Sequence, residues 1–329
     1  MAETGNIARM AEIVSDEIFG VFGWQRTGPV NENWTCVIPE HNRKTHPADV
    51  VFWYLDPYST KRIYVTVDLK SYAQGSINTS SINEALRNLA KTTECTQLSD
   101  AWRHLFHHRD MAFQPVSLLF VYNHDGAYDK SFISLLAQVT SNSHQLRAGN
   151  RMHVLGPRDV CYLKSIANDI KGLRGTPGDN GSFLLPQPND CSFFYPDLYR
   201  HKAVRSWGHP ATLETLSGPW QILKYRHQQS STTGYMVYYR GTGSTRDEFL
   251  YLIDFFFHYQ LLQDTSGIQI RAMFAANEAA VNFEKAKEEY ARAREGEESL
   301  LERLSLVSFR TLTTVFTQFS PIEIGMSYD

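Results

Sequence analysis

Hydrophobic and polar residues follow helical spacing at the start of the chain and strand spacing further on. The first apolar positions with helical spacing are Ile7, Met10, Val14, Ile18 and Phe22. This pattern predicts a helix over residues 7–22, ended by Gly23-Trp24. Two runs rich in β-branched and aromatic residues follow at 48–57 and 62–72, and the turn signal Asp56-Pro57 separates them. Because the connection is very short, the two runs predict an antiparallel hairpin.

Helices and strands continue to alternate through the rest of the first half. A helical stretch begins near Ser81, with Ser81 and Glu84 in capping-box spacing, and continues in pieces to about His108. The other elements predicted here are a strand at 34–39, a strand at 116–123, a helix at 129–141, a strand at 151–157 and a helix at 158–173. This order predicts an α/β domain with a central mixed sheet covered by helices.

The composition of the sequence changes between Gly172 and Pro219, where Gly, Pro and Asn are concentrated. We therefore place a first domain at residues 1–185, a linker at 186–218 and a second domain at 219–329. The elements predicted for the second domain are strands at 220–226, 234–240 and 268–274, helices at 245–262 and 277–294, and a β-rich terminal run. This order predicts a C-terminal α+β domain, and the sequence shows no internal repeat.

Composition narrows the class of protein. With 329 residues, 42% of them hydrophobic and 20% charged, the chain has material for packed cores. The net charge of −3 provides no global basic field, so local patches would have to hold any nucleic acid. No targeting segment opens the sequence and no apolar stretch is long enough to span a bilayer, which predicts a cytoplasmic protein without membrane association. The four cysteines lack C-x-x-C spacing, which argues against a zinc ribbon or a disulfide framework.

The candidate chemistry lies at the end of the run 62–72. Strand alternation directs Val65 and Val67 into the core and places Asp68 and Lys70 on the opposite face, about 7 Å apart. An Asp-x-Lys pattern alone is weak, because the chain has a second one, Asp169-Ile170-Lys171, in a predicted helix. Asp49, however, opens the preceding strand. If the two strands pair, Asp49 and Asp68 both reach one site and offer the oxygen ligands that Mg²⁺ prefers.

The first helix adds another acid. Glu17 stands at the edge of its apolar face, whereas Glu12 and Asp16 turn away from it. A carboxylate at a buried edge needs an ionic partner or a metal. Glu17 is therefore a further candidate ligand.

In order and spacing, these pieces resemble the PD-(D/E)xK nuclease superfamily, which includes restriction endonucleases and Mrr-like enzymes. The family shows a helix with an acid, a Gly-aromatic turn, a strand bearing Asp, a strand bearing (Asp/Glu)-x-Lys, and then a helix and further strands. The resemblance covers roughly residues 5–170. One departure is Ala48, which stands where the family pattern has the proline before its aspartate.

The resemblance implies a restriction-endonuclease-like fold and metal-dependent hydrolysis of phosphodiester bonds. It implies that Asp49, Asp68 and the Leu69 carbonyl hold Mg²⁺ or Mn²⁺, and that Lys70, with its pKa depressed beside the metal, positions or deprotonates the attacking water. Glu17 becomes a further ligand, with Glu12 as the alternative acid. The expected substrate is DNA, and the expected setting is restriction or antiphage defence.

Basic residues in two regions are candidates for contact with nucleic acid. Arg87 and Lys91 lie on the helix after Ser81, and a second group in the segment 195–209 is interleaved with aromatic residues. The second group comprises Arg200, Lys202 and Arg205. A charged helix surface and a basic linker are the alternatives for these two regions. The C-terminal domain is expected to provide target selection, a homodimer contact or a contact with a partner subunit.

Two other functions stay open at this point. In the first, the chain is a binding or regulatory subunit with a degenerate nuclease core. In the second, it is an interaction protein whose important domain is the C-terminal one. The intact set of Asp49, Asp68 and Lys70 argues against the first alternative. For the site itself, the alternative is a surface sheet edge with solvated charges.

Overall fold

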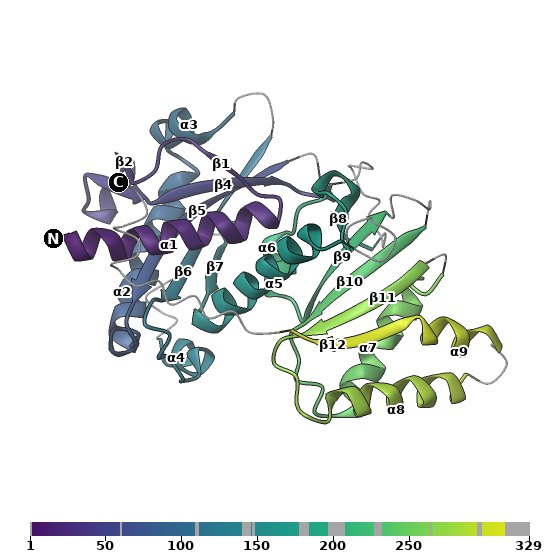
Figure 1. Cartoon of the computed structure of the whole chain (residues 1–329). Coiled ribbons are helices and arrows are strands. Elements are labelled where there is room, and N and C mark those ends of the chain that lie inside the picture. Colours follow the sequence, from purple (N-terminus) through teal and green to yellow (C-terminus); the bar gives the residue numbers. More distant parts are fainter. Residues whose placement is uncertain are drawn as a thin grey trace. The chain divides into compact units, whose positions relative to one another are not determined.

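The computed structural model describes residues 2–59, 61–108, 112–139, 146, 149–177, 184–196, 208–226, 232–263, 265–294 and 298–312. The chain divides into two compact units (Figure 1), an N-terminal unit that ends at Lys164 and a C-terminal unit that begins at Ser165. The division falls inside α5 (Pro157–Gly175), ahead of the boundary placed after residue 185. Part of the expected linker 186–218 is strand β8 (Cys191–Phe193), which hydrogen-bonds into the sheet of the C-terminal unit.

The N-terminal unit contains a five-stranded mixed sheet and a separate two-stranded sheet. The five strands, in spatial order, are β1 (Gln25–Thr27), β4 (Val50–Leu55), β5 (Arg62–Tyr72), β6 (Phe113–Asn123) and β7 (Met152–Leu155). The two-stranded sheet is an antiparallel hairpin of β2 (Glu32–Thr35) and β3 (Thr45–Ala48), joined through the 3₁₀ helix η1 (Pro39–His41). The helices are α1 (Ala2–Val21), η2 (Gln74–Ser76), α2 (Thr79–Thr96), α3 (Asp100–Phe106), α4 (Phe132–Gln138) and the first half of α5.

Helices α1 and α2 cover opposite faces of the five-stranded sheet. On one face Phe19 of α1 packs edge-on against Phe52 and Phe120, at centroid distances of 5.1 and 5.8 Å. On the other face α2 packs in a cluster that includes Leu119 and Val121. Successive residues of a strand point to opposite faces, so the alternation along β6 separates the two helices. The prediction of a mixed sheet flanked by helices is confirmed.

The predicted hairpin forms, with β4 and β5 antiparallel and Val50 opposite Val67. The pattern along β5 differs from the expectation that one face is buried, because Tyr64 and Thr66 are as buried as Val65. The reason is that β5 is a central strand with helices on both faces. Burial becomes partial from Asp68 onward, where β5 continues past the first residue of β4. The charged residues therefore begin where the two-sided cover ends.

Two local details show how the sequence ends and starts its helices. Gly23 follows α1 with φ +83°, a left-handed conformation that glycine adopts without strain, and Trp24 then stacks on Phe19 at 4.4 Å. The capping box of α2 exists, but its N-cap is Asn78, and Ser81 is the N3 partner rather than the N-cap. Asparagine is as good an N-cap as serine, so the helix begins earlier than its hydrophobic pattern indicates.

The C-terminal unit contains a second five-stranded mixed sheet. Its strands, in spatial order, are β8, β9 (Trp220–Arg226), β10 (Thr233–Tyr239), β11 (Thr265–Ala272) and β12 (Val307–Thr311). Its helices are the second half of α5, η4 (Pro188–Asp190), α6 (Leu213–Ser217), α7 (Arg246–His258), α8 (Ala279–Arg292) and α9 (Glu298–Ser305). The predicted strand at 220–226 is confirmed. The terminal run expected to be β-rich, 306–316, contains β12 and extends beyond the described residues.

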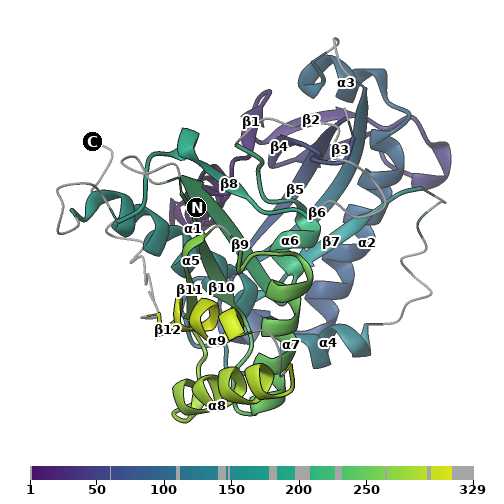
Figure 2. The ribbon, with the colours of Figure 1, turned by 90° about the vertical axis from the view of Figure 1, so that its right-hand side faces the viewer.

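The sheet of the C-terminal unit also has helices on both faces. Val237 of β10 packs in a cluster with residues of α7, α8 and α9, and α7 lies beside α8 (Figure 2). The neighbouring Tyr238 points the other way and donates a hydrogen bond of 2.9 Å to Asp169 of α5. The two faces of this sheet are therefore covered by different helices.

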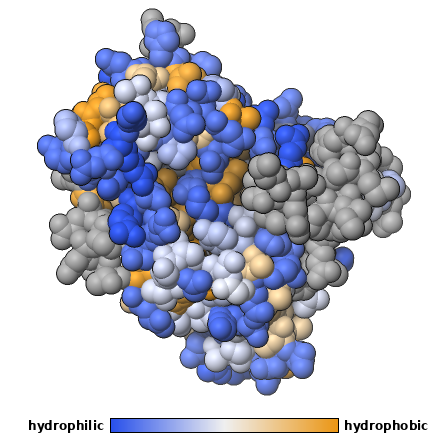
Figure 3. All heavy atoms as spheres, turned by 90° about the vertical axis from the view of Figure 1, so that its left-hand side faces the viewer, coloured by the Kyte–Doolittle hydropathy of each residue, from blue (hydrophilic) through white to orange (hydrophobic). Residues whose placement is uncertain are grey.

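No helix among the described residues is long and apolar enough to cross a membrane. The face of the molecule in Figure 3 is mostly hydrophilic, with small hydrophobic areas between the polar ones.

Candidate functional site

Asp49, Asp68 and Lys70 meet at the open end of the β4–β5 hairpin. Asp49 is the single residue between β3 and β4, and its Oδ2 accepts a hydrogen bond of 2.7 Å from the Leu69 backbone N–H. The Lys70 ammonium pairs with Asp68 Oδ1, as expected for two residues on one face of β5. The side chains of Asp68 and Lys70 are 18% and 30% exposed, so the group is anchored in the sheet and open to solvent.

The electrostatics of this group show an excess of negative charge. Burial and the neighbouring Asp68 carboxylate raise the pKa of Asp49 to about 6, against the opposing effects of the Leu69 N–H and the Lys70 ammonium. One lysine thus compensates two carboxylates only in part. A divalent cation would supply the missing positive charge, and carboxylate and carbonyl oxygens are the ligands that Mg²⁺ prefers. The residues present therefore fit a hard divalent cation.

The carboxylates of this group also determine the protonation of Lys70. Burial acts to lower the pKa of Lys70, but the carboxylates of Asp68 and Asp49 outweigh burial and raise it above the usual value. Lys70 is therefore an ammonium ion beside the two carboxylates. The expectation of a depressed pKa concerns Lys70 beside a bound metal and stays a prediction.

Glu17 and Glu12 have ionic partners of their own. Glu17 pairs with Lys164 of α5, whose side chain is only 6% exposed and needs an anion. Glu12 lies 3.8 Å from Arg9 and 3.9 Å from Arg26. α1 covers one face of the sheet, whereas Asp68 is in register with Leu119 and shares the α2 face. The structure therefore brings together Asp49, Asp68 and Lys70 and gives Glu17 a structural partner.

The basic residues expected to contact nucleic acid differ in their exposure and in their hydrogen-bond partners. Arg87 is exposed on α2. The Lys91 ammonium is half-buried and donates to the His41 carbonyl at 3.2 Å, so it holds η1 against α2. The other candidates, Arg200, Lys202 and Arg205, lie outside the described residues.

The second Asp-x-Lys of the sequence has a structural role. Asp169 accepts a hydrogen bond from Tyr238 and pairs with Arg271, and both partners belong to the sheet of the C-terminal unit. Lys171 is exposed on α5. Without a second acid on a paired strand, this motif joins a helix to a sheet.

One group with metal-binding atoms is not apparent from the spacing of residues in the sequence. It contains Cys36, His41, His46 and Cys95, whose ligand atoms lie within 4.8 Å of one another. Three of the four residues follow a C-x₄-H-x₄-H pattern that could have signalled the group, but the fourth ligand comes from a helix 49 positions later.

A comparison with protein families agrees with this geometry. Residues 1–159 match the family model described as the GAPS4 protein PD-(D/E)XK nuclease domain. No curated protein and no solved structure matches the chain. The matched region contains Asp49, Asp68 and Lys70 and the whole five-stranded sheet of the N-terminal unit. The N-terminal domain of this chain therefore belongs to the PD-(D/E)xK nuclease superfamily.

Proposed function

We propose that the protein is a Mg²⁺-dependent nuclease that hydrolyses phosphodiester bonds of DNA at the Asp49–Asp68–Lys70 group. One observation carries the proposal: within a domain of this superfamily, two carboxylates from paired strands converge beside a partly exposed lysine. Mn²⁺ is the alternative ion, because it prefers similar oxygen ligands.

In this proposal each residue of the group has its own role. Asp49, Asp68 and the Leu69 carbonyl would hold the cation, and the Leu69 N–H fixes the orientation of Asp49. The cation, when bound, offsets phosphate charge and lowers the pKa of bound water. Lys70 would orient the attacking water and stabilise the negative charge that develops on the phosphate.

The wider setting of the reaction is also a proposal. We place the protein in the cytoplasm, acting on foreign DNA in restriction or antiphage defence, with Arg87 in contact with the DNA backbone. The C-terminal unit would select the target or bind a second subunit. The family match supports a nuclease domain, and the exposed position of Arg87 on α2 supports its contact with phosphate.

The direct test is the cleavage of supercoiled plasmid by the purified chain with Mg²⁺, with Mn²⁺ and without a divalent ion. We expect cleavage only with a divalent ion, and its loss in Asp68→Asn, because an amide cannot supply the charge that holds the cation. Lys171→Ala is the matched control, since Lys171 is the exposed lysine of the other Asp-x-Lys. Its activity should equal that of the wild type. The same cleavage assay with single-stranded DNA and with RNA tests which nucleic acid is the substrate.

The second candidate is a non-catalytic, nucleic-acid-binding or regulatory subunit. If wild type and Asp68→Asn are equally inert on every substrate and with every ion, while both retain binding to DNA, this candidate replaces the nuclease. If cleavage persists in Asp68→Asn, the reaction belongs to another site.

A further inference from the structure

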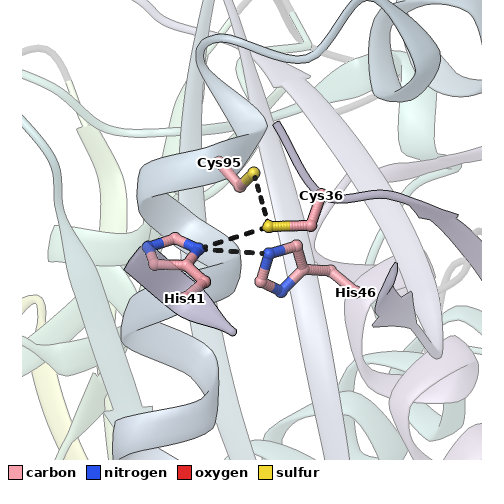
Figure 4. Close-up of side chains that lie close together, drawn as sticks. All are labelled: Cys36, His41, His46 and Cys95. Carbon is pink, nitrogen blue, oxygen red and sulfur yellow. Dashed lines mark hydrogen bonds between the residues drawn. The ribbon is translucent and has the colours of Figure 1, made fainter. Parts of the chain in front are cut away.

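Four side chains with metal-binding atoms meet between the β2–β3 hairpin and α2 (Figure 4). Cys36 directly follows β2, His41 ends η1 and His46 lies in β3, while Cys95 comes from the last turn of α2. His46 and Cys95 are fully buried, and His41 is 6% exposed. Cys36 is half-buried. Two thiols and two imidazoles thus face one another, and three of these four side chains are buried.

Three of the six distances between their inward atoms match the edges of a zinc tetrahedron, and all six are within 4.8 Å. Cys36 Sγ lies 3.7 Å from Cys95 Sγ and 3.6 Å from His41 Nδ1, and His41 Nδ1 lies 3.3 Å from His46 Nε2. With Zn–S of about 2.3 Å and Zn–N of about 2.0–2.1 Å, the tetrahedral S–S, S–N and N–N edges are about 3.8, 3.6 and 3.3 Å. All three kinds of contact agree with this geometry.

The outer hydrogen bonds of the two histidines turn their inner nitrogens into acceptors. His41 Nε2 lies 3.1 Å from the Glu94 carboxylate, which only accepts hydrogen bonds, so Nε2 carries the proton. Thr92 donates its hydroxyl hydrogen to the Asn88 carbonyl at 3.1 Å and therefore accepts from His46 Nδ1 at 3.3 Å.

When both rings are neutral, two nitrogen lone pairs, on His41 Nδ1 and His46 Nε2, face each other at 3.3 Å. Such an arrangement is repulsive unless a proton or a metal cation lies between the two nitrogens. Hydrogen bonds of this kind to the outer ring nitrogen are the usual support of a metal-bound histidine.

The surroundings also suit bound thiolates. The Val37 backbone N–H donates to Cys95 Sγ at 3.1 Å, which stabilises negative charge on that sulfur. The Cys36 thiol donates to the Ile38 carbonyl at 3.3 Å. Two thiolates neutralise a divalent zinc ion, so the site adds no net charge to the interior. Binding must release the thiol protons, which makes the affinity depend on pH.

We propose that Cys36, His41, His46 and Cys95 form a structural Zn²⁺ site. Four protein ligands leave no open coordination position, which is the arrangement of structural rather than catalytic zinc. The ion would join the β2–β3 hairpin to α2. Because His46 precedes Asp49 by three residues, the same ion would fix the segment that presents Asp49 to the nuclease group.

The test is the zinc content of the purified full chain, measured by elemental mass spectrometry after expression with zinc in the medium. We expect about one zinc per chain in the wild type and a loss of most of it in Cys36→Ser and Cys95→Ser. The matched controls are Cys161→Ser and His104→Asn, at a half-buried cysteine and an exposed histidine of the same unit. Asp68→Asn should also keep its zinc, which separates this site from the nuclease group and its proposed function.

A second measurement covers the case in which the cysteine variants fail to fold. Wild-type chain, stripped of zinc and loaded with Co²⁺, should show the visible absorption of tetrahedral cobalt and a thiolate-to-cobalt charge-transfer band, and added zinc should remove both. A wild type that carries no zinc and gives no such spectrum overturns the proposal. So does a zinc content that is unchanged in folded Cys36→Ser and Cys95→Ser.

Discussion

The two five-stranded sheets share one plan and differ at one end. Read from β1 to β7 and from β8 to β12, each sheet has two antiparallel pairings followed by two parallel ones. Helices pack on both sheets: α2 packs against β6 in the first sheet, and α7 packs in one cluster with β10 in the second. Similar topology does not require similar sequence, which explains why no repeat is visible along the chain.

The difference lies where each antiparallel hairpin opens. The N-terminal hairpin has Asp49 before β4 and Asp68-Leu69-Lys70 at the end of β5, whereas the C-terminal hairpin has Pro219 before β9 and Tyr239-Arg240-Gly241 at the end of β10. The backbone N–H of Arg240 donates to the Pro219 carbonyl at 3.0 Å, so the second hairpin closes with a backbone bond and no acid. The two hairpins therefore share a topology, and they differ in whether acidic side chains stand at the open end.

The largest expected effect comes from replacing the basic residue near the open end of each hairpin, Lys70 in the first and Arg240 in the second. Lys70→Met should lower plasmid cleavage by roughly 100-fold, because it removes charge stabilisation of the reacting phosphate. Arg240→Met removes a 2.7 Å hydrogen bond to the Leu216 carbonyl and should cost about 1 kcal/mol of unfolding free energy, with cleavage within about twofold of wild type. Equal losses of cleavage would mean that both hairpins take part in the chemistry.

Core substitutions should separate the two units by stability. Val67 of β5 and Val237 of β10 are both fully buried. Replacing either by alanine should cost about 2 kcal/mol, since two buried methyl groups are lost. In a calorimetric scan we expect Val67→Ala to lower one unfolding transition and Val237→Ala to lower another. A single transition that both variants lower equally would show that the units unfold together.

The last prediction concerns the buried carboxylate of Asp49, which has no counterpart at Pro219. Because the pKa of Asp49 rises to about 6 on folding, the folded state binds its proton more tightly than the unfolded state. Stability should therefore fall as pH rises from about 4 to about 6 and stay lower above that range. Asp49→Asn should remove this dependence and stabilise the protein at pH 8 by about 1–3 kcal/mol.

Urea unfolding at pH 5 and pH 8 without added magnesium measures this effect. Chelators are omitted because they would also remove zinc. The exposed Asp129 provides the control, and Asp129→Asn should leave the pH dependence as in wild type. A lower stability of Asp49→Asn at pH 8 would contradict the cost assigned to the buried carboxylate.

The parts of the site that could be predicted from the sequence are those with strand periodicity. Alternation placed Asp68 and Lys70 on one face, and a short connection predicted the pairing with the strand that follows Asp49. The fold class followed from the order of elements. The role of Glu17 could not be read in this way, because its partner Lys164 comes from a helix 147 positions later.

The Cys/His cluster shows the same limit more clearly. Spacing rules recognise zinc ligands that come in close pairs, and here the two cysteines are far apart in the sequence and meet only when α2 packs on the β2–β3 hairpin. The first turn of α2 was also misplaced, because Asn78 lies outside the hydrophobic pattern that marks the helix. Tertiary packing and caps, rather than periodicity, decide these features.

Asp49 joins two sheets, since Ala48 ends β3 in the small sheet and Val50 begins β4 in the large one. Its backbone carbonyl is held by the Asn31 N–H at 2.8 Å on the hairpin side, and its carboxylate by the Leu69 N–H on the core side. A shift of Asn31 at the base of the β2–β3 hairpin would therefore move this carboxylate without any substitution in the core. The small sheet is thus a second place, outside the packed interior, from which substitutions could change the geometry of the candidate metal site.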